Sequence, residues 1–458
     1  MIINWYQCYA TFAVSLCIVT STMHLAWPSP SIPKLLDGSH TLKLTSDEAS
    51  FLTIISLCGS IFGGLVAGPA MNRFGRLKSI LFSCVPYIIA WLAIAFANHV
   101  AILFSARFMV GFVDSLAFTA VPMYVGEIAD PHIRGLLGSY CAVSMIIGML
   151  ISNAVGLYNS IYTTALISIS VPVLLGLTCF HLPESPYFLI MRGRDDEAIK
   201  SLKRFKDPEV VQDEYKRLKE SIEEEIRNKA HFMDLFRVPY IRKALFITTS
   251  LRCIQQLVGL TSITFYTETI FSEVEGGISS ELWVILFYIV KLFVTTFASL
   301  IIDKTGRKPL LFVSLVGVTL SLFCVGIYSF LEDADDIDMS NYDYIPIIAL
   351  FVYIITYSFG LGPIAVLMLG ELMPTNVKTY ALCFVDIVFC TFGMLSSLYF
   401  QKTNDSYGLG VPFVSFGFCA FLSVGFVVFF TPETKGKTLE DIQESFRAKS
   451  KRKQISKK

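Results

Sequence analysis

The stretch that decides the fold class covers residues 281–330 and reads ELWVILFYIVKLFVTTFASLII-DKTGRK-PLLFVSLVGVTLSLFCVGIYSF. It holds two apolar runs, each long enough to cross a bilayer as a helix of about 20 residues. Only the polar residues 303–308 separate these runs. So short a connection between two long helices predicts neighbouring antiparallel spans. We therefore expect a chain that crosses a membrane several times.

The composition of the whole chain agrees with this local pattern. Of its 458 residues, 54% are hydrophobic and only 16% are charged, whereas soluble domains carry about 25% charged residues. A soluble protein of this composition would expose large apolar patches. We therefore predict an all-α membrane protein with twelve transmembrane helices. The expected spans are 5–27, 50–72, 79–97, 101–125, 136–157, 161–182, 243–271, 281–302, 309–330, 344–370, 379–401 and 411–431.

The positions of the basic residues predict the orientation of these spans. Cytoplasmic loops of membrane proteins are enriched in Lys and Arg. With the N-terminus inside, the outer connections hold only Lys34, Lys43 and Lys402. The outer loop between the ninth and tenth spans is acidic and carries no basic residue. Both termini are therefore expected in the cytoplasm.

The spans divide into two groups of six. Residues 1–182 are expected to form one six-helix bundle and residues 243–431 a second, with a cytoplasmic tail at 432–458. Between the bundles, residues 183–242 are polar, and 213–229 have helical periodicity. Short amphipathic helices on the cytoplasmic face, or a solvated linker without them, both fit this pattern. The first span is expected to end at Trp27-Pro28-Ser29-Pro30, in the first outer loop.

Three polar patterns recur at equivalent helix ends in both halves, which indicates an internal duplication of the parallel kind found in transporters. They are Arg73–Arg76 and Asp303–Lys308 after spans two and eight, Glu127 with Arg134 and Glu371 with Lys378 after spans four and ten, and Pro183-Glu184-Ser185 and Pro432-Glu433-Thr434 after spans six and twelve.

These helix-end charges can pair across the two halves at the cytoplasmic side. Each exposed pair contributes only about 0–1 kcal/mol, but together they form a candidate latch that opens and closes the inner mouth. The alternative is that they only anchor loops and fix the orientation. The candidate latch residues are Arg73, Arg76, Glu127, Arg134, Glu184, Asp303, Arg307, Lys308, Glu371, Lys378 and Glu433.

Charged residues also occur within the expected spans: Arg107, Asp114, Arg252, Lys291 and Asp386. A charge near the bilayer centre costs about 2.5–3.5 kcal/mol on insertion scales, so it usually faces a partner or a cavity. Asp114 and Lys291 both lie near the middle of a span, which suggests a mutual pair. This pair could be structural, or it could act on a substrate or a proton.

An ordered set of motifs resembles the sugar porter family of the major facilitator superfamily. It comprises Arg73-Phe74-Gly75-Arg76, Arg107, Pro122–Glu127, Arg134-Gly135, Pro183–Pro186, Gln255–Gly259, Asp303–Lys308, Gly362-Pro363, Glu371 and Pro432–Glu440. Trp27–Pro30 and Phe265-Tyr266 are most similar to the insect facilitated trehalose transporter branch. The resemblance implies the major facilitator fold and transport of hexoses, disaccharides or polyols by alternating access.

A sugar site needs amide or hydroxyl groups that replace water, together with an aromatic surface. Gln255 and Gln256 supply amide donors and acceptors, and the resemblance implies that both contact sugar. Interhelical hydrogen bonding is the alternative role for these two residues. Thr261, Tyr266 and Lys291 occupy further positions that the resemblance assigns to the substrate site. Tyr266 resembles an aromatic residue of the outer gate.

The sequence departs from the family at several lining positions, among them Ala142, Ala365-Val366 and Phe389. The expected function is still transport of trehalose or a hexose-like sugar. Related proton symporters need an acid in the first span, and residues 5–27 contain none. Facilitative uniport is therefore favoured, with symport through Asp114 or Asp386 as the alternative.

Two further alternatives stay open: a carrier of another polar or anionic solute, and a sugar sensor without transport. We expect no enzyme activity, cofactor, metal or nucleic-acid partner, because no nucleophile–base set, metal-ligand cluster or phosphate loop stands out. The expected partners are a small sugar and the lipid bilayer. A monomer in the plasma membrane is the expected state.

Overall fold

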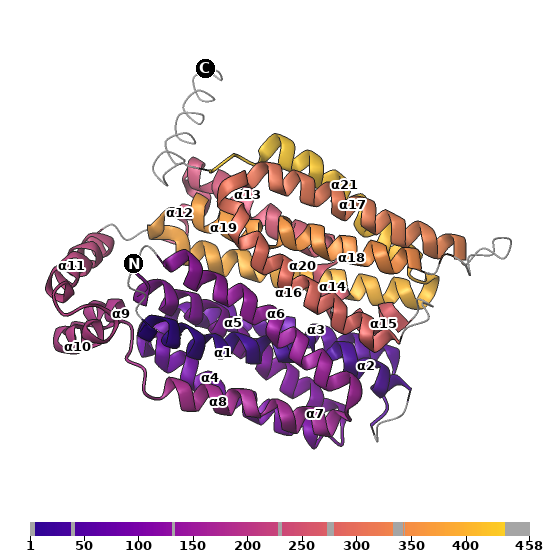
Figure 1. The fold of residues 1–458 in the computed structure, drawn as a ribbon, viewed down its shortest axis with the longest axis horizontal. Helices are drawn as coiled ribbons and strands as arrows, with labels where there is room; N and C mark the ends of the chain where they lie inside the picture. The colour runs from indigo at the N-terminus through magenta and orange to yellow at the C-terminus, as the bar shows by residue number, and fades with distance from the viewer. Residues whose placement is uncertain are drawn as a thin grey trace. The chain divides into compact units, whose positions relative to one another are not determined.

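The computed structural model describes residues 5–37, 42–130, 133–227, 231–272, 279–332, 342 and 344–435. Every regular element in these ranges is an α-helix. The chain divides into two compact units, Met1–Lys229 and Ala230–Lys458. Eleven of the described helices are long and apolar enough to cross a membrane. The prediction of an all-α, multi-pass membrane protein is therefore confirmed (Figure 1).

The N-terminal unit contains six spanning segments, and two of them are built from consecutive helices (Figure 1). A capping box starts the second span, where the Thr45 hydroxyl accepts from the Glu48 N–H and the Glu48 carboxylate accepts from the Thr45 N–H. The helices are α1 (Trp5–Ala26), α2 (Pro28–Leu36), α3 (Ser46–Phe74), α4 (Arg76–Ala95), α5 (Val100–Ile128), α6 (Arg134–Tyr158), α7 (Ile161–Ser168) and α8 (Ser170–Cys179).

The predicted helix end at Trp27–Pro30 is confirmed for α1, which ends at Ala26, but a second helix, α2, starts at Pro28 where the first outer loop is expected. The Trp27 N–H donates to the Met23 carbonyl at 3.0 Å, and Pro28 occupies the first position of α2. Proline has no backbone N–H. It is tolerated at this position because the N–H groups of the first residues of a helix have no acceptor within the helix. The segment is also held by Lys34, whose ammonium donates to three carbonyls at the C-terminal end of α6.

The linker between the bundles, for which the sequence predicts short amphipathic helices, contains four short helices in its described part. They are α9 (Pro186–Met191), α10 (Asp195–Phe205) and α11 (Val211–Arg227) in the N-terminal unit and α12 (Asp234–Arg237) in the C-terminal unit. Phe188, Ala198 and Ile222 meet in a small apolar core that joins α9, α10 and α11. The boundary between the two compact units follows residue 229, inside the predicted linker.

The C-terminal unit contains five of the eleven helices that are long and apolar enough to cross a membrane, and a segment of three shorter helices precedes them. This first segment comprises α13 (Pro239–Leu257), α14 (Leu260–Phe265) and α15 (Thr267–Ser272), and Gly259, in a left-handed conformation with φ of 83°, separates α13 from α14. The remaining helices are α16 (Ser280–Thr305), α17 (Arg307–Glu332), α18 (Tyr344–Phe359), α19 (Leu361–Leu372), α20 (Thr375–Tyr407) and α21 (Gly410–Phe430).

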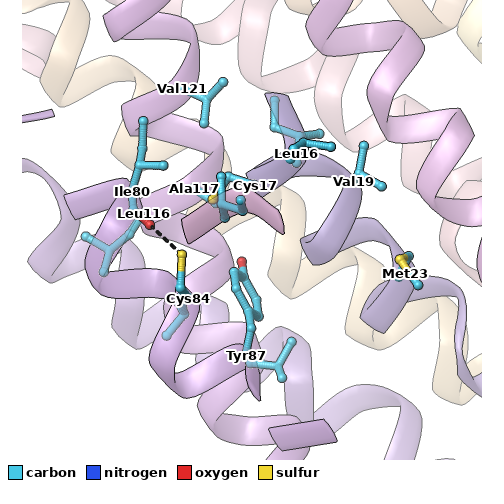
Figure 2. Close-up of a cluster of buried hydrophobic side chains, with 14 of the residues drawn as sticks. Leu16, Cys17, Val19, Met23, Ile80, Cys84, Tyr87, Leu116, Ala117 and Val121 are labelled. Carbon is cyan, nitrogen blue, oxygen red and sulfur yellow. Dashed lines mark hydrogen bonds between the residues drawn. The ribbon is translucent and has the colours of Figure 1, made fainter. Parts of the chain in front are cut away.

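The largest core of the N-terminal unit joins α1, α4 and α5. Figure 2 shows Leu16 and Cys17 of α1 packed near Tyr87 of α4 and Ala117 of α5. Cysteines serve as small apolar side chains here, and all eleven cysteines of the chain are free thiols. This core places the ring of Tyr87 beside the charged residues of α5.

Candidate functional site

The break after α13 lies where the sequence places the glutamine pair, and two neighbouring helices hold it in place. The Tyr353 hydroxyl on α18 donates to the carbonyl of Val258 at 3.1 Å. The Ser396 hydroxyl on α20 donates to the carbonyl of Gln256 at 3.0 Å. These bonds satisfy carbonyls that a continuous helix would have used internally. The sequence did not indicate a role for Tyr353 or Ser396, because both lie far along the chain from the residues that they bind.

Gln255 is engaged at both ends of its amide. Its Nε2 donates to the carbonyls of Leu361 and Gly362 at 3.1 and 2.9 Å, where α18 gives way to α19. Its Oε1 accepts from the guanidinium of Arg252 at 2.7 Å. Gln255 therefore ties α13 to α19 within the C-terminal unit.

The side-chain amide of Gln256, in contrast to that of Gln255, makes no hydrogen bond to the described residues. The side chain is fully buried. The amide lies against Gly393 of α20, where an added Cβ would come within 3.3 Å of it. An amide buried without partners costs about 1–3 kcal/mol. Such a group is a strong candidate for binding a hydroxyl-rich ligand.

Arg252 and Asp386 form an ion pair that the sequence spacing did not reveal. The closest nitrogen and oxygen atoms are 3.3 Å apart, and the two residues lie on α13 and α20. The guanidinium also lies over the ring of Phe389, 3.7 Å from its centroid. Two of the predicted intramembrane charges therefore compensate one another inside one unit.

The other predicted substrate residues lie on α14 and α16 or in the turn that follows α14. Thr261 is buried near the start of α14. Tyr266 is buried and stacks on Phe400 of α20, with ring centroids 5.3 Å apart. Lys291 is buried on α16, with its ammonium 5.6 Å from the centroid of the Tyr288 ring.

Arg107 is fully buried and connects three helices of the N-terminal unit. Its guanidinium donates to the carbonyl of His24 on α1, and to the hydroxyl of Ser56 on α3 at 3.1 Å. Asp114 accepts a hydrogen bond of 2.8 Å from the Tyr87 hydroxyl. A pair between Asp114 and Lys291 stays a prediction, since these residues belong to different units.

His24 is a buried polar residue that sequence analysis missed. Its ring stacks on Trp91 with centroids 3.8 Å apart, and neither ring nitrogen has a hydrogen-bond partner among the described residues. The only sequence signal was one histidine within an apolar run. Glu268 on α15 was also missed, and it accepts a bond from the Ser280 hydroxyl at 2.9 Å.

The candidate latch residues form two clusters with the same plan, one in each unit. In the N-terminal unit, Arg76 pairs with Glu127 at 3.0 Å, and Ser185 donates to the same carboxylate. The Glu184 carboxylate accepts from the backbone N–H groups of Arg76 and Leu77. It therefore caps the N-terminus of α4, where a negative charge is favourable.

The C-terminal unit repeats this plan. Arg307 pairs with Glu371 at 2.8 Å, and Thr434 donates to Glu371 at 2.5 Å. The Glu433 carboxylate accepts from the N–H groups of Arg307 and Lys308, both at 3.0 Å. The preceding glycines, Gly75 and Gly306, have φ of 100° and 101°. The repeated polar patterns therefore correspond to repeated hydrogen-bond networks.

Three other latch candidates make hydrogen-bond contacts within their own unit. Arg73 offers its carbonyl to Arg192, the Lys308 ammonium donates to the carbonyl of Val428, and Lys378 lies 3.5 Å from the carbonyl of Gly370. The side chains of Arg134 and Asp303 lie outside the described part of the structure. The ion pairs found here each join residues of one unit, so pairing across the halves stays a prediction.

Replacing Glu433 with glutamine is expected to lower the free energy of unfolding by about 1–2 kcal/mol, because a charged helix cap is lost. Partial burial alone would raise the pKa of Glu433. Four backbone N–H donors outweigh that effect and hold its pKa below the usual value. The carboxylate therefore stabilises the fold above the ordinary carboxyl pKa, and this contribution is lost as the pH falls through the lowered value.

The measurement is the thermal midpoint of the purified protein in detergent, from pH 7 down to about pH 4. The difference between the parent and E433Q should shrink toward the acidic end. E209Q removes an exposed carboxylate of the linker and should leave the midpoint unchanged. A difference that is constant with pH would contradict the capping role.

The model of the sugar (and other) transporter family matches residues 15–446. The facilitated trehalose transporter Tret1 of Drosophila virilis is 33% identical over 98% of this chain and 49% of its own length. The Aedes aegypti protein of the same name is 31% identical over 98% of this chain and 56% of its own. The chain thus spans about half the length of these relatives.

Solved structures share the fold. The inward-open xylose transporter XylE from E. coli aligns with a TM-score of 0.78, at 22% identity, over 95% of this chain and 98% of that one. A structure of the same symporter of the major facilitator superfamily, bound to 6-bromo-6-deoxy-D-glucose, aligns with a TM-score of 0.78 at 23% identity, over 97% of this chain and 100% of that one. The predicted twelve-helix major facilitator fold is confirmed. These relatives and solved structures are transporters and not enzymes, and the chain belongs to the sugar (and other) transporter family.

Proposed function

We propose that this protein carries a neutral sugar, trehalose or a hexose-like one, across the plasma membrane by alternating access. The observation that carries the proposal is the buried, unpartnered amide of Gln256. It offers a donor and an acceptor that a sugar hydroxyl could satisfy. The named relatives are trehalose transporters, which supports the same substrate class.

The two glutamines have different roles in this proposal. Gln256 binds the sugar directly. Gln255 is a positioning residue, because its amide is already shared between Arg252 and the carbonyls of α19. Thr261, Tyr266 and Lys291 complete the proposed substrate set. Tyr266 lies packed against Phe400, so its proposed outer-gate role requires it to leave this contact.

The proposed transport mode is facilitative uniport. No Asp or Glu occurs in α1, and the carboxylates of Asp114 and Asp386 are engaged by Tyr87 and Arg252. An engaged carboxylate is less available to carry a proton. The uptake rate should therefore change less than about twofold when an inward proton gradient is imposed on proteoliposomes. Accumulation of sugar above its external concentration, driven by that gradient, would establish symport instead.

Substrate choice is tested by uptake of labelled trehalose, glucose, a polyol and an organic anion into liposomes that contain the purified chain. Sugar uptake that unlabelled trehalose inhibits would support the proposal. Uptake of the anion alone would favour the second candidate, a carrier for anionic solutes. The ion pair between Arg252 and Asp386 argues against that candidate, since it neutralises one of the two cations that motivate it. Sugar binding without uptake would identify a sensor.

The helix-end clusters are proposed to act as the cytoplasmic latch. Arg76 with Glu127, and Arg307 with Glu371, lie beside the glycine turns of the two units. The motion of one half against the other would require only that a few such weak pairs exchange partners. The basic residues of these turns support an orientation with both termini in the cytoplasm. The chain is proposed to act as a monomer.

A further inference from the structure

An apolar groove lies on the C-terminal unit, away from the glutamine pair. It has a volume of about 630 Å³ and is lined by residues of α12, α13, α20 and α21. Its long wall is one face of α13, from Arg242 to Leu257. At 1.5 Å per residue, this wall is about 22 Å long. One leaflet of the bilayer core is about 15 Å deep, so the groove could hold an extended acyl chain.

The side chains that line the groove are mostly apolar, and several of them are aromatic rings that contact one another. Phe236 of α12 packs edge-on against Phe384 near the Arg242 end, with ring centroids 5.5 Å apart. Phe246 of α13 meets Phe426 of α21 at 6.0 Å across the groove. Each of these aromatic pairs joins two of the helices that line the groove.

The end of the groove near α12 is basic. Residues 234–243, DLFRVPYIRK, carry three basic residues and one acidic residue. Arg242 lines the groove in the first turn of α13, and both Arg242 and Arg237 are exposed. Two helical turns further along α13, Thr249 lines the groove, and its buried hydroxyl has no hydrogen-bond partner among the described residues. An apolar channel with a cationic entrance and one inner hydroxyl matches the chemistry of a lipid.

We propose that this groove is a binding site for an anionic phospholipid such as phosphatidylserine. The phosphate and carboxylate of the head group lie at Arg242, one acyl chain lies along α13 and α21, and an ester carbonyl accepts from the Thr249 hydroxyl. The head group is in the cytoplasmic leaflet if the proposed orientation holds. Anionic lipids are concentrated in that leaflet, and each basic residue near its surface attracts them.

The test is native mass spectrometry of the full chain released from nanodiscs that contain equal amounts of phosphatidylserine and phosphatidylcholine. The parent protein should retain phosphatidylserine preferentially. R242Q should reduce the ratio of retained phosphatidylserine to phosphatidylcholine about fivefold, the change expected for one basic residue at an anionic surface. R217Q removes a guanidinium of α11 that is 67% exposed and should not change the ratio. An unchanged ratio in R242Q would overturn the proposal.

Filling the groove tests the acyl-chain part independently. Ser423 lines the groove, and its hydroxyl bonds only the carbonyl of Cys419 in its own helix. S423F should therefore remove the retained lipid of either kind. S299F makes the same change at an exposed position of α16 and should retain it. If S423F does not fold, C419F fills the same wall.

Lipid retention by a folded groove-filling variant equal to that of the parent would overturn the proposal. Retention of a sterol from sterol-containing nanodiscs, with no dependence on Arg242, would overturn it as well. The measurement reports bound lipid and not sugar uptake, so its outcome is independent of whether the chain transports trehalose.

Discussion

Replacing Gln256 with leucine is expected to lower sugar uptake at least tenfold while the thermal midpoint stays unchanged or rises. The leucine has a similar volume and no polar atoms, so it removes a buried amide that has no partner among the described residues. The folded protein loses no hydrogen bond of that side chain. The bound sugar loses one or two hydrogen bonds to the amide. Because about 1.4 kcal/mol of binding free energy corresponds to a factor of ten in affinity, this loss accounts for the lower uptake.

The matched change at Gln255 should behave differently. Gln255→Leu leaves two carbonyls of α19 and the Arg252 guanidinium without their present partner. Each buried polar group left unsatisfied costs about 1–3 kcal/mol, so the thermal midpoint should fall. Q401A removes an amide bonded to Asp405 at the far end of α20 and serves as the control for uptake.

Uptake into proteoliposomes and thermal midpoints in detergent are measured on the same preparations. If Q256L and Q255L lower the midpoint equally, Gln256 is a structural residue. If Q256L keeps full uptake, the proposed sugar contact is wrong. Only the combination of lost uptake and retained stability supports direct binding by Gln256.

The fold was predictable because its strongest signals are local. An apolar run of about 20 residues identifies a span without knowledge of its neighbours, and a basic loop indicates the side of the membrane. The repeated helix-end patterns were equally readable. Glu184 and Glu433 lie at corresponding positions, and each caps the helix that follows a glycine turn in its own unit.

The site was only partly predictable, because adjacent residues on a helix face different directions. Gln255 and Gln256 look equivalent in sequence, but successive side chains diverge by about 100° on a helix of 3.6 residues per turn. One amide therefore meets α19 and the other Gly393 of α20. The ion pair of Arg252 and Asp386 joins residues 134 positions apart, and no spacing rule connects them.

The helix α2, which follows the predicted end of the first helix, was not predicted for a similar reason. Pro28 and Pro30 predict a helix end when only local propensity is considered. In the structure, the proline-containing helix α2 is held from outside, by the bonds between Lys34 and the C-terminal carbonyls of α6. Tertiary contacts of this kind lie beyond what the sequence of the segment can indicate.

The sequence of an apolar run does not reveal how closely its helix packs against a neighbour. The backbones of α3 and α5 approach each other closely where glycines of one helix face the backbone of the other. A Cβ at Gly111 would lie 1.7 Å from the carbonyl oxygen of Ser56, and one at Gly63 would lie 2.1 Å from that of Phe112. Small residues allow helix backbones to meet closely in membranes, where the hydrophobic effect does not drive association. Polar bonds between the helices depend on this distance, such as that from Ser60 to the carbonyl of Gly111 at 3.0 Å.

Gly111→Ala is therefore expected to lower the thermal midpoint by about 2–12 °C. The single added methyl group must push two backbones apart, and overpacking of this kind costs about 1–3 kcal/mol or more, with about 2–4 °C per kcal/mol for a unit of this size. Gly126→Ala, on the same helix, is the matched control, because nothing lies within 4 Å of its added Cβ. It should keep or raise the midpoint, since alanine favours helix over glycine by about 1 kcal/mol. Equal midpoints for the two variants would show that α3 and α5 do not meet as closely as the glycine contacts require.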